Sequence, residues 1–253
     1  MRLLRAALAV EGRKTAAARV TIATTVILAV GVVSIATGMT LAARCGNADV
    51  LAKLGPAASI GGWEGLIAVV LQITAAGGVL AFGVVLSWMI GREFDDGTVT
   101  GLFALPVRRD TIALAKLLIY LLWTVGVALV LVLVVALVGL VLRLDAPAPG
   151  VGILLLRLLA LTILSALIAM PAGWAATLGR GVLPGIATTV GIIAVAQVMV
   201  VAGTGAWFPF TTPALWALSP GSVMPYQLAL VAVVPAGFGL LTMRAWANLQ
   251  LDR

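Results

Sequence analysis

The chain has 253 residues, of which 62% are hydrophobic and only 10% are charged, and its mean hydropathy is +1.20. Soluble domains carry about 25% charged and about 45–50% apolar residues, so this composition excludes a soluble globular protein and indicates a membrane protein. The sequence has no histidine and one cysteine, Cys45, which excludes an intrachain disulfide and a metal site built from histidine and cysteine ligands. We interpret the net charge of +7 as a sign of membrane topology rather than of nucleic-acid binding.

The first segment, residues 2–19, mixes basic residues with apolar residues at helical spacing, such as Leu4 and Leu8. This pattern predicts a short amphipathic helix that lies in the membrane surface, with Arg5 and Lys14 among the lipid headgroups. The alternative interpretation is a frayed cytoplasmic tail. A cleavable signal peptide is excluded, because it needs an uninterrupted apolar stretch that this segment lacks.

A bilayer core of about 30 Å is crossed by roughly 20 apolar helical residues. Charge-free windows of that length predict six membrane-spanning helices within a single transmembrane domain, residues 1–253. The windows are residues 20–43, 65–91, 117–142, 158–179, 182–201 and 226–243. Prolines and aromatic residues fill the stretch between the last two windows. Because proline breaks helices, we expect an outer hairpin there that lies at the interface or re-enters the membrane.

Lysine and arginine residues predict the orientation of these spans. With the N-terminus in the cytoplasm, only Arg44, Lys53, Arg143 and Arg157 fall outside, and the other twelve of the 16 basic residues fall inside. Basic residues collect on the cytoplasmic side of membrane proteins. We therefore expect a multi-pass protein of the cell inner (plasma) membrane with both termini in the cytoplasm.

The six windows contain no acidic or basic residue. Proton-coupled transport and intramembrane proteolysis both need such groups or catalytic side chains within the membrane, so these classes are excluded. The sequence also lacks a phosphate-binding loop with Gly-Lys-Ser/Thr. We therefore expect the chain not to be an enzyme by itself, and uphill transport would take its energy from another polypeptide.

Uncharged polar residues remain within the windows and are candidates for a weak substrate pathway. For the serine and threonine residues the favoured alternative is helix–helix hydrogen bonding, at roughly 0.6 kcal/mol per contact. For the glutamines both interpretations stay open, because an unpaired amide is costly in lipid. The candidate pathway residues are Gln72, Thr74, Ser87, Thr124 and Gln197.

The segment Gly91–Lys116 concentrates four acidic and four basic residues between two apolar windows. Its pattern predicts a short amphipathic helix, a break at Pro106 and then the third span. A short helix beneath the membrane, with acids on its exposed side, suits docking into a cleft of a soluble partner. The alternative is a solvated loop that carries ordinary cytoplasmic charge.

In its order of residues this segment resembles the loop of ABC-2-type exporter permeases, which shows an acidic residue, Gly-Thr, a leucine, Pro-x-x-Arg and a lysine. The general form is most similar to permeases of the bacitracin and lantibiotic immunity type. In that family the loop forms a coupling helix that contacts the nucleotide-binding subunit. The resemblance therefore implies an ATPase-coupling role for Glu93, Asp95, Asp96, Gly97, Thr98, Leu102, Leu105, Pro106, Arg108 and Arg109.

The resemblance implies the permease subunit of an ABC exporter that moves an amphiphilic substrate outward, such as a drug, an antibiotic peptide or a lipid. It also implies that ATP and Mg²⁺ are bound by a separate ATPase subunit. Two identical or similar permeases would form a dimer with the pathway between them. The alternatives are a non-transporting immunity or sensor protein and an uncoupled channel or flippase. No role is predicted for Cys45.

Overall fold

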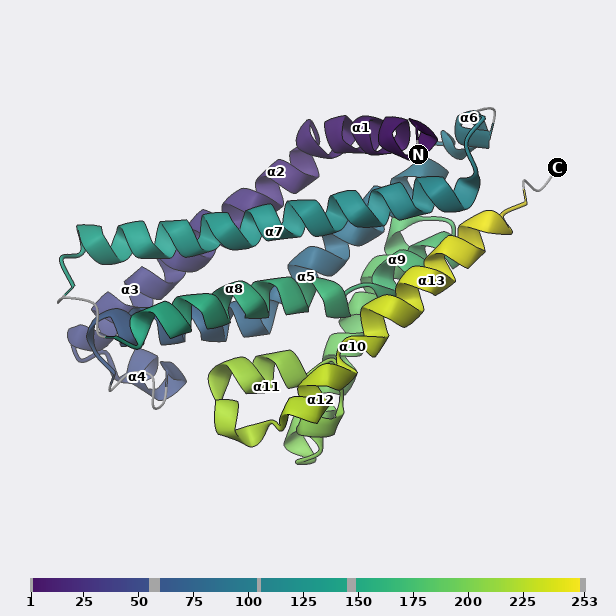
Figure 1. Cartoon of the computed structure of the whole chain (residues 1–253). Coiled ribbons are helices and arrows are strands. Elements are labelled where there is room, and N and C mark those ends of the chain that lie inside the picture. The colour runs from purple at the N-terminus through teal and green to yellow at the C-terminus, as the bar shows by residue number, and fades with distance from the viewer. Residues whose placement is uncertain (1, 55–59, 104–105, 145–148, 251–253) are drawn as a thin grey trace.

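The computed structural model describes residues 2–54, 60–103, 106–144 and 149–250. Within these ranges every regular element is a helix, which confirms the predicted all-α fold (Figure 1). Six helical segments are long and apolar enough to cross a membrane, as the sequence predicted. Their bounds are Arg19–Ala43, Gly62–Asp95, Arg109–Val141, Val151–Leu178, Val182–Val201 and Pro225–Ala247.

The N-terminal part of the chain forms a succession of short helices, which includes the first span. These are α1 (Arg2–Ala16), α2 (Arg19–Val26), the π-helical turn η1 (Ile27–Gly31), α3 (Val32–Arg44) and α4 (Ala48–Leu54). The segment predicted to be an N-terminal helix is helical, and α1 packs against α7 (Arg109–Val141) instead of fraying. Its position in the membrane surface stays a prediction.

Helices α5 (Gly62–Asp95) and α7 are the longest in the described parts of the chain; α5 ends after the apolar window that predicted it, and α7 begins before its window. Glu93 therefore lies in the last turn of α5, and Lys116 lies in the third turn of α7. The apolar windows themselves stay free of charge, but the helices that contain them carry charged residues beyond the window bounds. The physical reason is that backbone hydrogen bonding continues a helix until a residue breaks it, whatever the hydropathy of the side chains.

A short connection joins α5 to α7 and contains α6 (Val99–Phe103). Gly97 ends α5 in the left-handed region, with a φ of +67°, and its N–H donates to the carbonyl of Phe94 at 3.1 Å. Glycine is favoured in this conformation because it has no Cβ. Pro106 comes three residues before the first residue of α7. The predicted helix–break–helix pattern is present in the described residues of this segment.

The fourth span is broken by a proline. It consists of α8 (Val151–Ile168) and α9 (Pro171–Leu178), and a tight turn at residues 179–181 leads into α10 (Val182–Val201). Proline has no N–H to donate and its ring clashes with the preceding turn, so the helical hydrogen bonds are interrupted just before it.

Between α10 and the last span the chain forms short helices that do not cross the membrane by themselves. These are η3 (Gly205–Trp207), α11 (Thr212–Leu218) and η4 (Pro220–Ser222). The last span consists of α12 (Pro225–Leu230) and α13 (Val233–Ala247). It breaks close to Val231, four residues before Pro235, where the proline ring disrupts the helix. How deeply the predicted outer hairpin enters the membrane stays a prediction.

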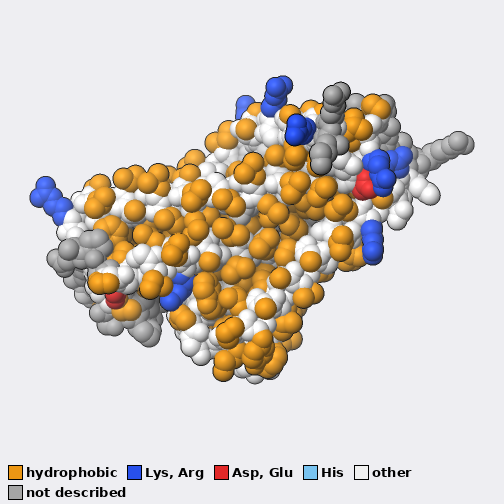
Figure 2. Space-filling model, in the orientation of Figure 1, with side chains coloured by type: hydrophobic (Ala, Val, Ile, Leu, Met, Phe, Trp, Pro, Cys, Tyr) orange, Lys and Arg blue, Asp and Glu red, His pale blue; other side chains and the backbone are white. Residues whose placement is uncertain are grey.

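Helix α5 lies at the centre of the bundle and packs against α3, α8, α9 and α10. Its side chains Phe82, Leu86 and Ile90 are fully buried. Figure 1 shows both termini at the end of the molecule that carries α6, which we call the α6 end, and α4 at the opposite end. On the face shown in Figure 2, apolar side chains cover the middle, while charged side chains gather toward the ends. This distribution suits a bilayer-spanning body.

Candidate functional site

Four charged residues meet at the α6 end of the bundle and form what we call the ionic cluster: Glu11, Lys14, Glu93 and Lys116. The Nζ atom of Lys116 lies 2.8 Å from Oε2 of Glu11 and 2.9 Å from Oε1 of Glu93. The Nζ atom of Lys14 lies 3.0 Å from the same Glu93 oxygen and 3.4 Å from Oε1 of Glu11. Each lysine therefore pairs with both glutamates. The hydroxyl of Thr98 also donates a hydrogen bond of 2.6 Å to Oε2 of Glu93.

Three members of the ionic cluster are buried, the side chain of the fourth, Lys14, is 31% exposed, and the charges of the cluster balance. Glu93 and Lys116 are each 1% exposed and Glu11 is 4% exposed. Burial lowers the pKa of Lys14, but the charges and hydrogen bonds of Glu11 and Glu93 outweigh it and raise that pKa above its ordinary value. Lys14 therefore stays charged at neutral pH. Two positive and two negative groups in mutual contact satisfy the requirement that buried charges be paired.

This placement corrects the position expected for Glu93. From the sequence we expect Glu93 among the residues that contact the ATPase, with the acids of this segment on the exposed side of a short helix. In the structure its carboxylate points inward to Lys14 and Lys116 and is closed to a partner's cleft. The sequence held one signal of this cluster: Glu11 is the only acidic residue before Asp49, in a segment that is otherwise basic.

The other candidate coupling residues lie beside the cluster on the connection between α5 and α7. Asp95, Asp96, Gly97, Thr98, Pro106 and Arg108 are exposed, and Leu102 and Arg109 are partly buried. Leu105 lies outside the described residues. Arg108 makes two hydrogen bonds, of 3.2 and 2.7 Å, to the carboxylate of Asp110. This connection therefore presents charged side chains to the surroundings at the α6 end.

Two contacts tie this connection to distant parts of the chain. The carboxylate of Asp95 accepts a hydrogen bond of 3.1 Å from the backbone N–H of Val182, the first residue of α10. It thereby satisfies one of the free N–H groups at the start of that helix. The guanidinium of Arg109 donates to the carbonyl oxygen of Leu249, which follows α13. At the α6 end, side-chain hydrogen bonds therefore connect α5 with α10, and α7 with the residues that follow α13.

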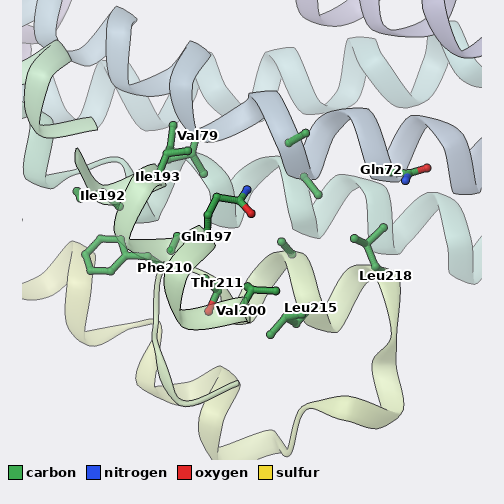
Figure 3. A pocket seen from close by; sticks show the side chains of 14 residues that line it. Gln72, Val79, Ile192, Ile193, Gln197, Val200, Phe210, Thr211, Leu215 and Leu218 are labelled. Atoms are coloured by element: carbon green, nitrogen blue, oxygen red, sulfur yellow. The ribbon is translucent and has the colours of Figure 1, made fainter. Parts of the chain in front are cut away.

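Two of the five candidate pathway residues share a pocket. Gln72 of α5 and Gln197 of α10 line a cavity of about 270 Å³ between α5, α10 and α11. Figure 3 shows Gln197 among apolar side chains such as Ile193 and Val200, whereas Gln72 lies farther along α5 with its amide turned away from them. Both glutamines are exposed side chains. The pocket thus combines apolar walls with two groups that donate and accept hydrogen bonds.

The other three candidate pathway residues are buried away from this pocket. The hydroxyl of Ser87 donates to the carbonyl of Gly83 at 2.6 Å, and that of Thr124 donates to Tyr120 at 2.9 Å. Both bonds are made within the residue's own helix. The buried hydroxyl of Thr74 has no hydrogen-bond partner in the part of the chain that the structure describes. The structure therefore does not bring these residues together with the glutamines.

These features define a class before they define a family. Six apolar helices and an apolar middle region make the chain a multi-pass membrane protein. The model of the family described as ABC-2 family transporter protein matches residues 8–197, and the chain therefore belongs to this family. Comparison with curated proteins and with solved structures gives no significant match.

Membership of this family gives the general role of the chain. The chain is a permease subunit of an ABC transporter, a transport component rather than a catalytic enzyme, and membership implies an ABC ATPase subunit as partner. The matched residues run from α1 into α10 and leave out the short helices that follow α10 and the last span. Similarity to the bacitracin and lantibiotic immunity permeases stays a prediction.

Proposed function

We propose that this chain is the permease subunit of an ABC exporter that works with a separate ATPase, on which ATP and Mg²⁺ are bound. The observation that carries this proposal is the stretch at the α6 end of an ABC-2 family chain, described at residues 95–103 and 106–109, which exposes Asp95, Asp96 and Arg108. We call this stretch the coupling segment. Its exposed acidic residues Asp95 and Asp96 suit a basic cleft on the ATPase. In this proposal the α6 end faces the cytoplasm, and the membrane is the plasma membrane.

The coupling segment has a structural route to the pocket. The carboxylate of Asp95 accepts a hydrogen bond from the first residue of α10, and α5 leads directly into the segment. The two helices approach so closely that a Cβ atom added at Gly91 would lie 2.5 Å from the backbone of Gly181 and Val182. A displacement of the segment by the ATPase would therefore move α5 and α10 together. These helices carry Gln72 and Gln197 on the walls of the pocket.

The lining of the pocket supports an amphiphilic substrate. Its apolar side chains suit the body of a drug, a lipid or an antibiotic peptide, and Gln72 and Gln197 can orient a hydrogen-bonding group of that substrate. An amide left against lipid is costly, so two exposed glutamines on neighbouring helices favour a polar contact over a lipid-facing role. We propose outward movement of such a substrate, driven by the partner ATPase.

The test uses an exposed residue, because Glu93 is buried. Asp96 is exposed on the coupling segment, and Asp96→Arg reverses a charge at the proposed contact. The matched control is Asp49→Arg, which makes the same change at an exposed residue of α4, at the opposite end of the molecule. We expect Asp96→Arg to lose most of the co-purifying ATPase, while Asp49→Arg retains it and both variants reach the membrane in normal amounts.

Equal ATPase recovery with both variants would contradict docking at the coupling segment. If the unaltered chain recovers no ATPase, the exporter proposal itself fails. A non-transporting immunity or sensor protein, or an uncoupled channel or flippase, would then be the better interpretation.

A further inference from the structure

The ionic cluster connects parts of the chain that are far apart in sequence. Glu11 and Lys14 belong to α1, Glu93 to the last turn of α5, and Lys116 to α7. Residues 11 and 116 are 105 positions apart, yet their charged groups are in direct contact. Lys116 also donates to the carbonyl of Met89, at 3.3 Å, one turn before Glu93. Three helices are therefore held together by charge at the α6 end.

One residue of the coupling segment reaches this cluster. Thr98 is exposed, but its hydroxyl donates to Oε2 of Glu93 at 2.6 Å, whereas Oε1 of Glu93 accepts from the two lysines. Hydrogen bonds to a charged acceptor are stronger than those between neutral groups. Glu93 thus connects the segment on one side with α1 and α7 on the other.

Stability alone is a poor explanation for this arrangement. Removing two charges from water is expensive, and replacing a buried ion pair by neutral groups of similar volume is often neutral or stabilising. Ion pairs add a constraint on position, because the ammonium group of each lysine must stay close to the carboxylates of both glutamates. Such a network favours one relative arrangement of its helices over others that apolar packing would tolerate.

We propose that Thr98, Glu93, Lys116, Glu11 and Lys14 act as positioning residues for energy coupling. They make the coupling segment, α1 and the adjoining ends of α5 and α7 move as one body when the ATPase acts. This inference rests on the proposed function. It assigns α1 a role in force transmission, beyond that of a helix resting on the membrane surface.

Two variants break the contacts between the coupling segment, α1 and α7 in different ways, and we call these contacts the linkage. Thr98→Val deletes the hydroxyl that bonds to Glu93 and changes an exposed residue, so the fold is preserved. The double variant Glu93→Gln with Lys116→Met removes one charge of each sign and leaves Glu11 paired with Lys14. The matched control for the first is Thr242→Val on α13, where the hydroxyl donates to Phe238 of its own helix at 2.8 Å.

The measurement is the distance between spin labels on α1 and on the coupling segment, in the complex with the ATPase. Val10, which is 52% exposed, and the exposed Thr100 are labelled through cysteine substitutions after Cys45→Ser removes the native thiol. We expect this distance to stay the same with and without ATP and vanadate in the otherwise unaltered chain and in Thr242→Val. In Thr98→Val and in the double variant, nucleotide should shift or broaden it by several ångströms.

Each outcome decides the inference. If ATP and vanadate change this distance in a chain that carries neither Thr98→Val nor the double substitution, α1 and the coupling segment do not move as one body. An unchanged distance in Thr98→Val would show that the linkage is not needed, even if the double variant fails to assemble. Loss of ATPase from Thr98→Val alone would place this residue in the docking contact instead. Recovery of ATPase with the unaltered chain is measured first, because its absence would refute the proposed function and not this inference.

Discussion

Two glutamates and two lysines share one buried site at the α6 end, and the consequence of a substitution there depends on the charge that it leaves behind. Lys116→Met leaves Glu11 and Glu93 with Lys14 as their remaining lysine partner. Removing one member of a buried ion pair costs about 3–5 kcal/mol. We expect a clear fall in the melting temperature of the purified permease in detergent. The charge-balanced double variant Glu93→Gln with Lys116→Met should melt closer to the unaltered protein. If the single and double variants melt alike, the four charges do not form a coupled network.

Reversal of charge at Glu93 is expected to disrupt the permease itself. An arginine at this position would meet Lys14 and Lys116 and leave Glu11 as the only acid of the cluster. Two buried cations and the partly exposed Lys14 would then face a single carboxylate, so the buried positive charge could not be fully paired. We expect Glu93→Arg to reduce the amount of folded permease in the membrane, measured by size-exclusion chromatography of a fluorescent fusion. A sharp monodisperse peak at the normal height would contradict the buried placement of Glu93.

Between elements, the contact of α5 with α10 depends on glycines. A Cβ atom added at Gly83 would lie 2.4 Å from Oγ1 of Thr189, and one added at Gly91 would lie 2.5 Å from the backbone of Gly181. Overpacking of this kind costs about 1–3 kcal/mol. We expect Gly83→Ala and Gly91→Ala both to lower the melting temperature, with Gly91→Ala the more harmful, because its clash is with backbone.

The two glycines also differ in how their substitution can be rescued. Thr189→Ala removes the side-chain atoms that crowd position 83, so we expect it to restore part of the stability lost in Gly83→Ala. The same change should not rescue Gly91→Ala. Rescue of both variants, or of neither, would contradict the packing of α5 on α10 described above.

For the whole molecule, both ends of the chain lie at the α6 end in Figure 1, and the distribution of basic residues predicts that this end faces the cytoplasm. We expect a fluorescent protein fused after Arg253 to be bright, since such fusions fold in the cytoplasm, and a periplasmic phosphatase fusion at the same site to be inactive. A dark fluorescent fusion together with an active phosphatase would overturn this orientation.

We also expect the working complex to contain two permease chains. A single chain exposes Gln72 and Gln197 beside an open pocket, and a second copy or a similar permease could cover this region and enclose a pathway. Mass measurement of the ATPase-bound complex in detergent should therefore give two permeases. An active complex with only one permease chain would contradict this expectation.

The sequence by itself determined the membrane class, the number of spans and the place of the segment 91–116. These depend on local quantities: the hydropathy of about 20 consecutive residues, and the backbone limits of residues such as Gly97 and Pro106. These quantities misjudge where α5 ends and where α7 begins, because a window defined by hydropathy stops at the first charge whereas the helix does not.

Only the tertiary structure decided which distant residues meet. Nothing local to Glu93 shows that Lys116 and Glu11 come within hydrogen-bonding distance of one another, or that Gln72 shares a pocket with Gln197 while Thr124 does not. A charge next to an apolar span has the same sequence pattern whether it faces solvent or a counter-charge on another helix. The difference depends on the rotation and crossing of helices, which packing sets across the whole bundle.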